Sequence, residues 1–99
     1  MSMGVHLYQM TCWQSPTGKY HVNDVKNLAG KSGKWYVPMR ILDVTIDEYV
    51  DLLVKMGAKD LHYYAPTDYL GFHFLREADA KKFCAYINKA ARARNYKCA

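Results

Sequence analysis

Asp60-Leu-His-Tyr-Tyr-Ala65 begins the segment that determines the fold class of this 99-residue chain. The segment continues through Pro66-Thr-Asp68 to Tyr69-Leu-Gly-Phe-His-Phe-Leu75. Two runs rich in aromatic and apolar residues on either side of a short turn-forming segment are typical of a β-hairpin, here with a three-residue connection. The sequence therefore predicts two adjacent antiparallel strands over residues 60–65 and 69–75.

Alternation along residues 69–75 predicts which face of this hairpin is buried. Every second residue from Leu70 to Phe74 is apolar, whereas His73 lies on the other face. A one-residue slip would bury His73 and expose two phenylalanines, so we expect the apolar side chains to face the core. The same alternation, extended to the other predicted strands, places these side chains on the open face of the sheet: His6, Tyr8, Tyr36, Arg40, His62, Tyr64, Tyr69 and His73.

Two helices accompany the predicted hairpin. Thr45 and Glu48 have the spacing of a capping box, Val44 and Tyr49 are placed for a hydrophobic staple, and Gly57 supplies a left-handed stop. A helix is therefore expected between Thr45 and Gly57. The last segment predicts a long amphipathic helix, whose apolar stripe contains Ala80, Phe83, Cys84, Ile87 and Ala91.

Two further strands complete the predicted sheet. Residues 4–14 are rich in β-branched, aromatic and apolar types and end at the turn-forming Ser15-Pro16-Thr17-Gly18. Residues 34–42 alternate well enough for a second strand, with Pro38 at a bulge or a local edge. Between these strands, residues 16–34 are expected to form a basic, mobile loop with at most a short helix from an Asn23 cap.

The predicted order of elements is β-loop-β-α-β-β-α within a single domain over residues 1–99. The simplest layering is an α+β fold, with a four-stranded antiparallel sheet and two helices on one face. If residues 34–42 run beside residues 69–75, the unit 34–95 is a split βαβ of the ferredoxin-like kind. The N-terminal strand would then pair with residues 34–42.

Residues 34–88 resemble an RNA-recognition motif in two segments. Trp35-Tyr36-Val37 stands where that family has its first signature strand, and Leu70-Gly71-Phe72-His73-Phe74-Leu75 is similar to its second signature. Leu70 replaces the family's basic residue, and the usual fourth strand is absent unless residues 5–13 substitute for it. The resemblance implies RNA binding with Phe72 and Phe74 as an exposed stacking platform, whereas alternation turns both inward.

Composition and charge narrow the class of protein. The formal charge is +5 at pH 7, and residues 76–99 alone contain seven Lys or Arg against two acidic residues. Such an asymmetry favours an anionic partner or an acidic protein surface, although a basic helix is also often only a solvated face. The three cysteines, Cys12, Cys84 and Cys98, form neither a disulfide framework nor a metal knuckle, so we expect reduced thiols in a cytoplasmic protein. We expect no secretion signal and no membrane-spanning segment.

Three functions are compatible with this pattern. The first is a non-enzymatic module that binds nucleic acid, with RNA or a single strand favoured, because tyrosine and histidine rings suit stacking on unpaired bases and lysines neutralise phosphates. The second is a small inhibitor or adaptor that binds an intracellular protein, such as a phage-encoded factor that blocks a host nucleic-acid enzyme, because Tyr and Arg also anchor protein interfaces. The third is an RNA-cleaving enzyme that uses His62 and His73. The tyrosines could also simply cover the sheet with amphipathic bulk.

The candidate binding residues fall into the basic loop, the open sheet face and the last helix: Lys19, Lys26, Lys31, Lys34, Tyr36, Arg40, His62, Tyr64, Tyr69, His73, Lys82, Lys89 and Arg92. If the helices cover one side of the sheet, the last helix and the open face lie on opposite sides, and one contact surface cannot easily use both. The sequence leaves a homodimer open.

No cofactor is predicted. Ala29-Gly30-Lys31-Ser32 lacks the earlier glycine of a phosphate-binding loop, since Val25 stands at that position. Three histidines on one sheet face could ligate a transition metal, but no carboxylate stands at a fixed spacing from them, so we predict no metal site and no catalytic residue.

Overall fold

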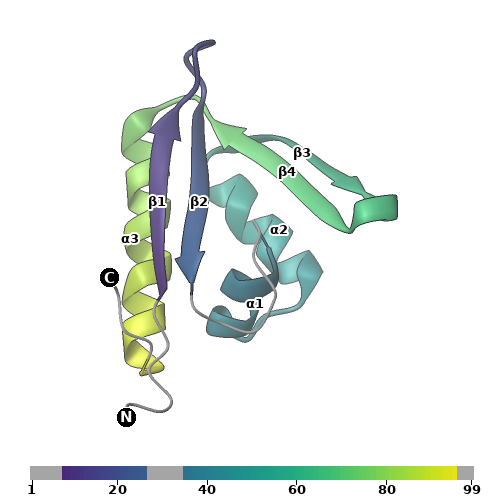
Figure 1. The fold of residues 1–99 in the computed structure, drawn as a ribbon. Helices are drawn as coiled ribbons and strands as arrows, with labels where there is room; N and C mark the ends of the chain where they lie inside the picture. The colour runs from purple at the N-terminus through teal and green to yellow at the C-terminus, as the bar shows by residue number, and fades with distance from the viewer. Residues whose placement is uncertain (1–7, 27–34, 96–99) are drawn as a thin grey trace.

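The computed structural model describes residues 8–26 and 35–95, and Figure 1 shows how their helices and strands are arranged. In chain order these are β1 (Tyr8–Gln14), β2 (Tyr20–Lys26), α1 (Tyr36–Leu42), α2 (Ile46–Lys55), β3 (Ala58–Tyr64), a 3-10 turn (Ala65–Thr67), β4 (Tyr69–Phe74) and α3 (Glu77–Ala93). The strands form one antiparallel sheet in the order β1-β2-β4-β3.

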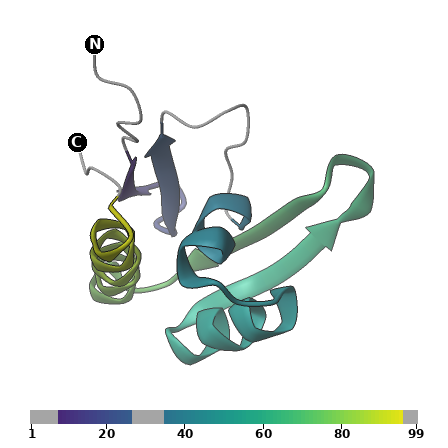
Figure 2. The same cartoon turned by 90° about the horizontal axis from the view of Figure 1, so that it is seen from below.

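The predicted fold class is confirmed at the level of layers. The sheet has four antiparallel strands, and the helices pack behind it, as Figures 1 and 2 show from two directions. As expected, the N-terminal strand lies at one edge of the sheet, and β4 is an interior strand whose hairpin partner β3 forms the other edge. The element order is β-β-α-α-β-β-α, however, with three α-helices in the described residues, so the arrangement is not the classic ferredoxin-like one.

The prediction of a strand over residues 34–42 was wrong, because residues 36–42 form α1. Val37 and Ile41 stand four residues apart, and both are buried at 1% exposure, so they form a helical stripe as well as a strand face. Pro38 lies in the first turn of the helix, where its missing amide hydrogen has no intrahelical partner to lose. Asp43 then ends the helix in the left-handed conformation, with φ 58°.

The second strand is β2, within the segment predicted as a basic loop. The turn over Ser15–Gly18 is confirmed: Gly18 has φ 87°, and its N–H donates to the Ser15 carbonyl at 2.9 Å. After this turn Val22 faces the core at 1% exposure, and Tyr20 is half-buried beside it. The short helix predicted from Asn23 is therefore wrong up to Lys26, and the rest of that segment lies outside the described residues.

β1 and β2 form one hairpin, and β3 and β4 form another. The two hairpins pair with each other at a single register position, Tyr20 opposite Phe74. From that junction they splay apart, which is visible in Figure 1. The prediction that residues 69–75 lie beside residues 34–42 is thus corrected to β4 beside β2.

The core confirms the predicted helices and the inward face of β4. Leu70, Phe72 and Phe74 are buried, and Phe72 and Phe74 pack against Phe83 of α3 with ring centroids 6.2 and 5.7 Å apart. The other members of the predicted α3 stripe are also buried, namely Ala80, Cys84, Ile87 and Ala91.

The capping box of α2 is present in full. The Glu48 N–H donates to Thr45 Oγ1 at 3.2 Å, and the Thr45 N–H donates to Glu48 Oε1 at 2.8 Å. The helix stops before Gly57, which has φ 100° as its predicted left-handed role requires. These reciprocal bonds satisfy amide groups that the helix itself leaves without partners.

Asn88 of α3 fixes the position of the edge strand β1. Its Oδ1 accepts from the Met10 N–H at 2.7 Å, and its Nδ2 donates to the Met10 carbonyl at 3.1 Å. An edge strand otherwise presents such groups to other chains, so Asn88 protects one point of this edge.

Among the helices described here, none has the length and apolar character needed to cross a bilayer.

Candidate nucleic-acid interface

A row of side chains crosses all four strands on the face away from the helices. Trp13 of β1 lies opposite His21 of β2, and His73 of β4 lies opposite Lys59 of β3. The Tyr20–Phe74 pair places His21 next to His73, and their ring centroids are 6.2 Å apart. Trp13 and His21 stack at 4.8 Å with 25° between their planes. The row therefore presents three adjacent rings and then a lysine.

Trp13 is both exposed and held in place. Its side chain is 47% exposed. Its Nε1 donates to the side-chain oxygen of Asn23 at 2.6 Å in the amide orientation that also lets Asn23 donate to the Val22 carbonyl. With one ring face stacked on His21, Trp13 is a fixed aromatic plane at the surface, the kind of group on which an unpaired base can stack.

Three more rings lie further along the β3–β4 hairpin. Tyr64 is opposite Tyr69, and the two are 56% and 41% exposed. His62 is opposite Gly71, and its ring centroid is 6.1 Å from that of Tyr69. An added Cβ on Gly71 would stand only 2.3 Å from His62 Cε1, so this glycine provides the space in which the imidazole lies.

Asp60 connects two of the histidines. The β3–β4 pairing is irregular between Lys59 and His62, and within this bulge Asp60 has φ 55°. The Asp60 carbonyl accepts from His62 Nδ1 at 2.9 Å, while its carboxylate Oδ2 lies 3.5 Å from His73 Nε2. β-Bulges redirect side chains in this way and are frequent beside functional sites.

These groups surround one cavity of about 220 Å³, which we call the histidine cavity. All three histidines among the described residues line it. The complete lining is Lys19, His21, Asp60, His62, Tyr69, Gly71, Phe72 and His73. Across residues 8–26 and 35–95, no three His, Cys, Asp or Glu side chains are arranged to hold a metal ion. The cavity therefore combines imidazoles, a carboxylate, an ammonium group and aromatic rings.

The structure brings together one part of the predicted site. Tyr64, Tyr69, His62 and His73 all lie on the open face, and Lys19 lies beside them at the end of the first turn. The prediction for His73 is corrected in part, because its side chain lies on the predicted face of the sheet but is only 7% exposed. Its neighbours are Lys59 across the strand pair, Asp60 at 3.5 Å and the ring of His21.

The remaining predicted residues are elsewhere. Tyr8 was expected outside but is fully buried, because β1 turns Tyr8 and Met10 toward α3. Tyr36 and Arg40 lie on α1 in the helix layer instead of on the sheet. The three predicted basic residues of α3 are exposed, namely Lys82, Lys89 and Arg92. His6, Lys31 and Lys34 lie outside the described residues, and Lys26 is described only through its backbone pairing.

The sequence-based prediction of the site did not include Trp13, His21, Lys59 or Asp60. A usable signal was present, since Trp13 and His21 flank the Ser15–Gly18 turn at positions that pair across a hairpin. The position of Asp60 depends on a bulge that strand alternation does not reveal. The two phenylalanines of the signature-like segment are in the core, and Trp35-Tyr36-Val37 stands at the start of α1, so neither forms an exposed stacking platform.

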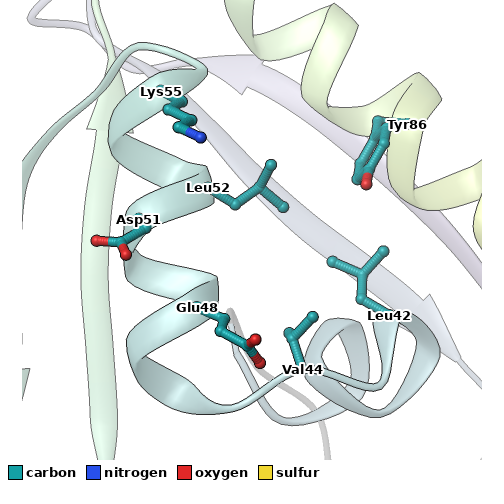
Figure 3. Close-up of a pocket in the computed structure, with 7 residues that line it drawn as sticks. All are labelled: Leu42, Val44, Glu48, Asp51, Leu52, Lys55 and Tyr86. Carbon is teal, nitrogen blue, oxygen red and sulfur yellow. The ribbon is translucent and has the colours of Figure 1, made fainter.

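A second concave surface lies in the helix layer, shown in Figure 3. This groove of about 360 Å³ lies between the α1–α2 segment and α3. Leu42, Leu52 and Tyr86 point toward one another across it, while Asp51 points away. Its charged lining residues are Glu48, Asp51 and Lys55, so the groove carries a small excess of negative charge, which opposes a nucleic-acid backbone.

The chain matches no protein family, no curated protein and no solved structure. Its function is therefore inferred from its own geometry.

Proposed function

We propose that this protein binds single-stranded nucleic acid on the open face of its sheet. The observation that carries the proposal is the set of exposed or half-buried rings on that face, Trp13, His21, Tyr64 and Tyr69, next to Lys19 and Lys59. Base-on-aromatic stacking contributes about 1–3 kcal/mol per base and tolerates any sequence. A duplex, whose bases are already stacked, would not use these rings.

The sheet face supports this function better than the basic last helix does. Lys82 and Lys89 are exposed on α3, but they lie in the helix layer with no cluster of exposed rings around them in the described residues. Lys19 and Lys59, in contrast, flank the ring row directly. We assign the phosphate contacts to these two lysines, with the bases on Trp13 and Tyr69.

A fluorescence titration tests the proposal. Trp35→Phe leaves Trp13 as the reporter, because the chain has two tryptophans. Addition of a single-stranded 2′-O-methyl oligonucleotide should quench Trp13, and an equal amount of duplex should not. Lys19→Ala should reduce the slope of log K against log salt by about 0.7, the value for one phosphate contact on a single strand. Lys82→Ala is the matched control and should leave the slope unchanged. Absence of quenching at low salt would refute the proposal.

A protein partner is the second candidate, and the groove of Figure 3 favours it. Its floor is apolar, and Tyr86 on its edge is 46% exposed, which suits an amphipathic peptide with basic residues. In that case Tyr86→Ala and Leu52→Asp would weaken binding, and Tyr69→Ala would not. Two-hybrid or pull-down comparison of these three variants separates this candidate from the first.

A further inference from the structure

The histidine cavity contains more acid–base chemistry than a stacking surface needs. Three imidazoles, a carboxylate and a lysine line a space of about 220 Å³, and Asp60 contacts two of the imidazoles. We propose that this cavity cleaves RNA by internal transesterification, with His62 as general base and His73 as general acid. This inference rests on the proposed binding of single strands to the same face.

His62 has the proton arrangement that a base requires. A carbonyl oxygen can only accept, so the 2.9 Å contact with the Asp60 carbonyl places the imidazole proton on Nδ1. Nε2 of the neutral ring then carries the lone pair. Gly71 lets this ring lie in the cavity wall, since an added Cβ would stand 2.4 Å from Nε2.

His73 is oriented by Asp60 and is suited to the acid role. The Asp60 carboxylate, 3.5 Å from His73 Nε2, can compensate the charge of an imidazolium. Nδ1 is then the atom that donates a proton to the substrate. Asp60 is a positioning residue in this scheme, because it acts through His73. Two further titratable groups adjoin His73, namely Lys59 opposite it on β3 and His21 beside it on β2. Lys19, His62 and Tyr69 line the same cavity.

The reaction needs no component besides the RNA strand. His62 Nε2 takes the proton of a ribose 2′-hydroxyl while the 2′-oxygen attacks the adjacent phosphorus. The new O2′–P bond forms as the P–O5′ bond breaks, and His73 transfers its proton to the departing 5′-oxygen. The products are a 2′,3′-cyclic phosphate and a free 5′-hydroxyl. The Lys19 ammonium group is placed in the cavity lining to stabilise the additional negative charge on the phosphoryl oxygens.

A labelled single-stranded RNA incubated with the protein in EDTA tests the reaction. We expect fragments ending in 2′,3′-cyclic phosphate, and no cleavage of the same sequence as DNA. His62→Ala and His73→Gln should each slow cleavage by about 10²–10⁴-fold, the usual effect of one general acid or base. Lys81→Ala on the exposed side of α3, prepared in parallel, should retain full activity. A contaminating nuclease would instead leave His62→Ala and His73→Gln as active as the wild type.

A 5′-bridging phosphorothiolate RNA separates the two roles. Its thiolate leaves without protonation, so this substrate should restore the rate of His73→Gln and of Asp60→Asn but not that of His62→Ala. Asp60 is exposed, so Asp60→Asn keeps the test open if His73→Gln fails to fold. Equal rescue of all three variants, loss of cleavage in EDTA, or full activity of His62→Ala would overturn the assignment. If the 2′-O-methyl strand binds but RNA stays intact, only this inference fails; if neither occurs, the proposed function fails too.

Discussion

Gly71→Ala should slow RNA cleavage in the histidine cavity by about 10²-fold while leaving the fold intact. The added Cβ would stand 2.3 Å from His62 Cε1, 2.4 Å from His62 Nε2 and 3.0 Å from Tyr69 Cε2, so His62 must move the most. Ordinary van der Waals contact begins near 3.4 Å, so the imidazole must retreat by roughly 1 Å or more. Since His62 is an exposed side chain at a strand surface, it can move without disturbing the core.

The expected magnitudes differ strongly for activity and stability. A displacement of about 1 Å at a catalytic group costs on the order of 10²-fold in rate. The free energy of unfolding should change by less than about 1 kcal/mol, because the lower entropy of the unfolded alanine chain offsets the weakened His62–Asp60 hydrogen bond. Gly71 has no positive φ, so alanine fits its backbone.

Urea denaturation and single-turnover RNA cleavage measure the two quantities on the same samples. The double variant Gly71→Ala/His62→Ala provides the control. If the alanine acts by displacing His62, the double variant should cleave no more slowly than His62→Ala alone. Cleavage by Gly71→Ala at the wild-type rate, or additive losses in the double variant, would show that His62 is not displaced or does not act as the base.

Three further predictions concern the stability of the fold, through residues of the helix layer and the cap of α2. Asn88→Ala removes both side-chain bonds to Met10 and should lower the free energy of unfolding by about 1–3 kcal/mol in urea; an unchanged midpoint would show that β1 does not depend on Asn88. Thr45→Ala should cost about 1 kcal/mol, with Thr45→Ser as the control that retains the cap. Burial is the main cause that raises the pKa of Cys84 to about 12, and the nearby Cys12 adds to it. The stability that the protonated thiol gives the fold is therefore complete below pH 9 and is lost as the pH rises toward 12. Cys84→Ala should therefore lose less stability than the wild type between pH 8 and pH 10, a difference of about 1 kcal/mol, and parallel losses would contradict the shift.

Local signals in the sequence were sufficient for the elements whose cause is local. The capping box at Thr45 and Glu48 satisfies neighbouring amides and needs no tertiary contact, so α2 follows from sequence alone. The stripe of α3 and the inward face of β4 also follow, because they are the only placements that bury the phenylalanines together. The spatial order of the strands was likewise predicted, apart from the identity of the second strand.

The second strand was missed because its core face carries a carboxylate. Tyr20 and Val22 alternate inward, but Asp24 takes the next inward position and interrupts the apolar pattern. The apolar residues of 36–42 fit the period of a strand and the period of a helix equally well. In the fold this segment is a helix behind the two splayed hairpins, and no local signal in the sequence indicates that. Tertiary packing therefore decided both assignments.

The candidate site was predictable only where strand alternation determines a face. Tyr64, Tyr69 and His62 follow from the hairpin, whereas His21 depends on recognising β2 and Asp60 depends on a bulge. The contact between Asp60 and His73 joins residues through a left-handed conformation at φ 55°, which a non-glycine residue rarely adopts. No periodic pattern encodes that contact.

An NMR titration locates the binding of nucleic acid on the open sheet face residue by residue. Backbone amide shifts would be followed while a single-stranded 2′-O-methyl oligonucleotide is added to the ¹⁵N-labelled protein. We expect the largest changes at Trp13, His21, Tyr69 and His73, with Leu52 and Tyr86 in the helix groove unchanged. Changes confined to the helix groove, or no changes at low salt, would contradict it.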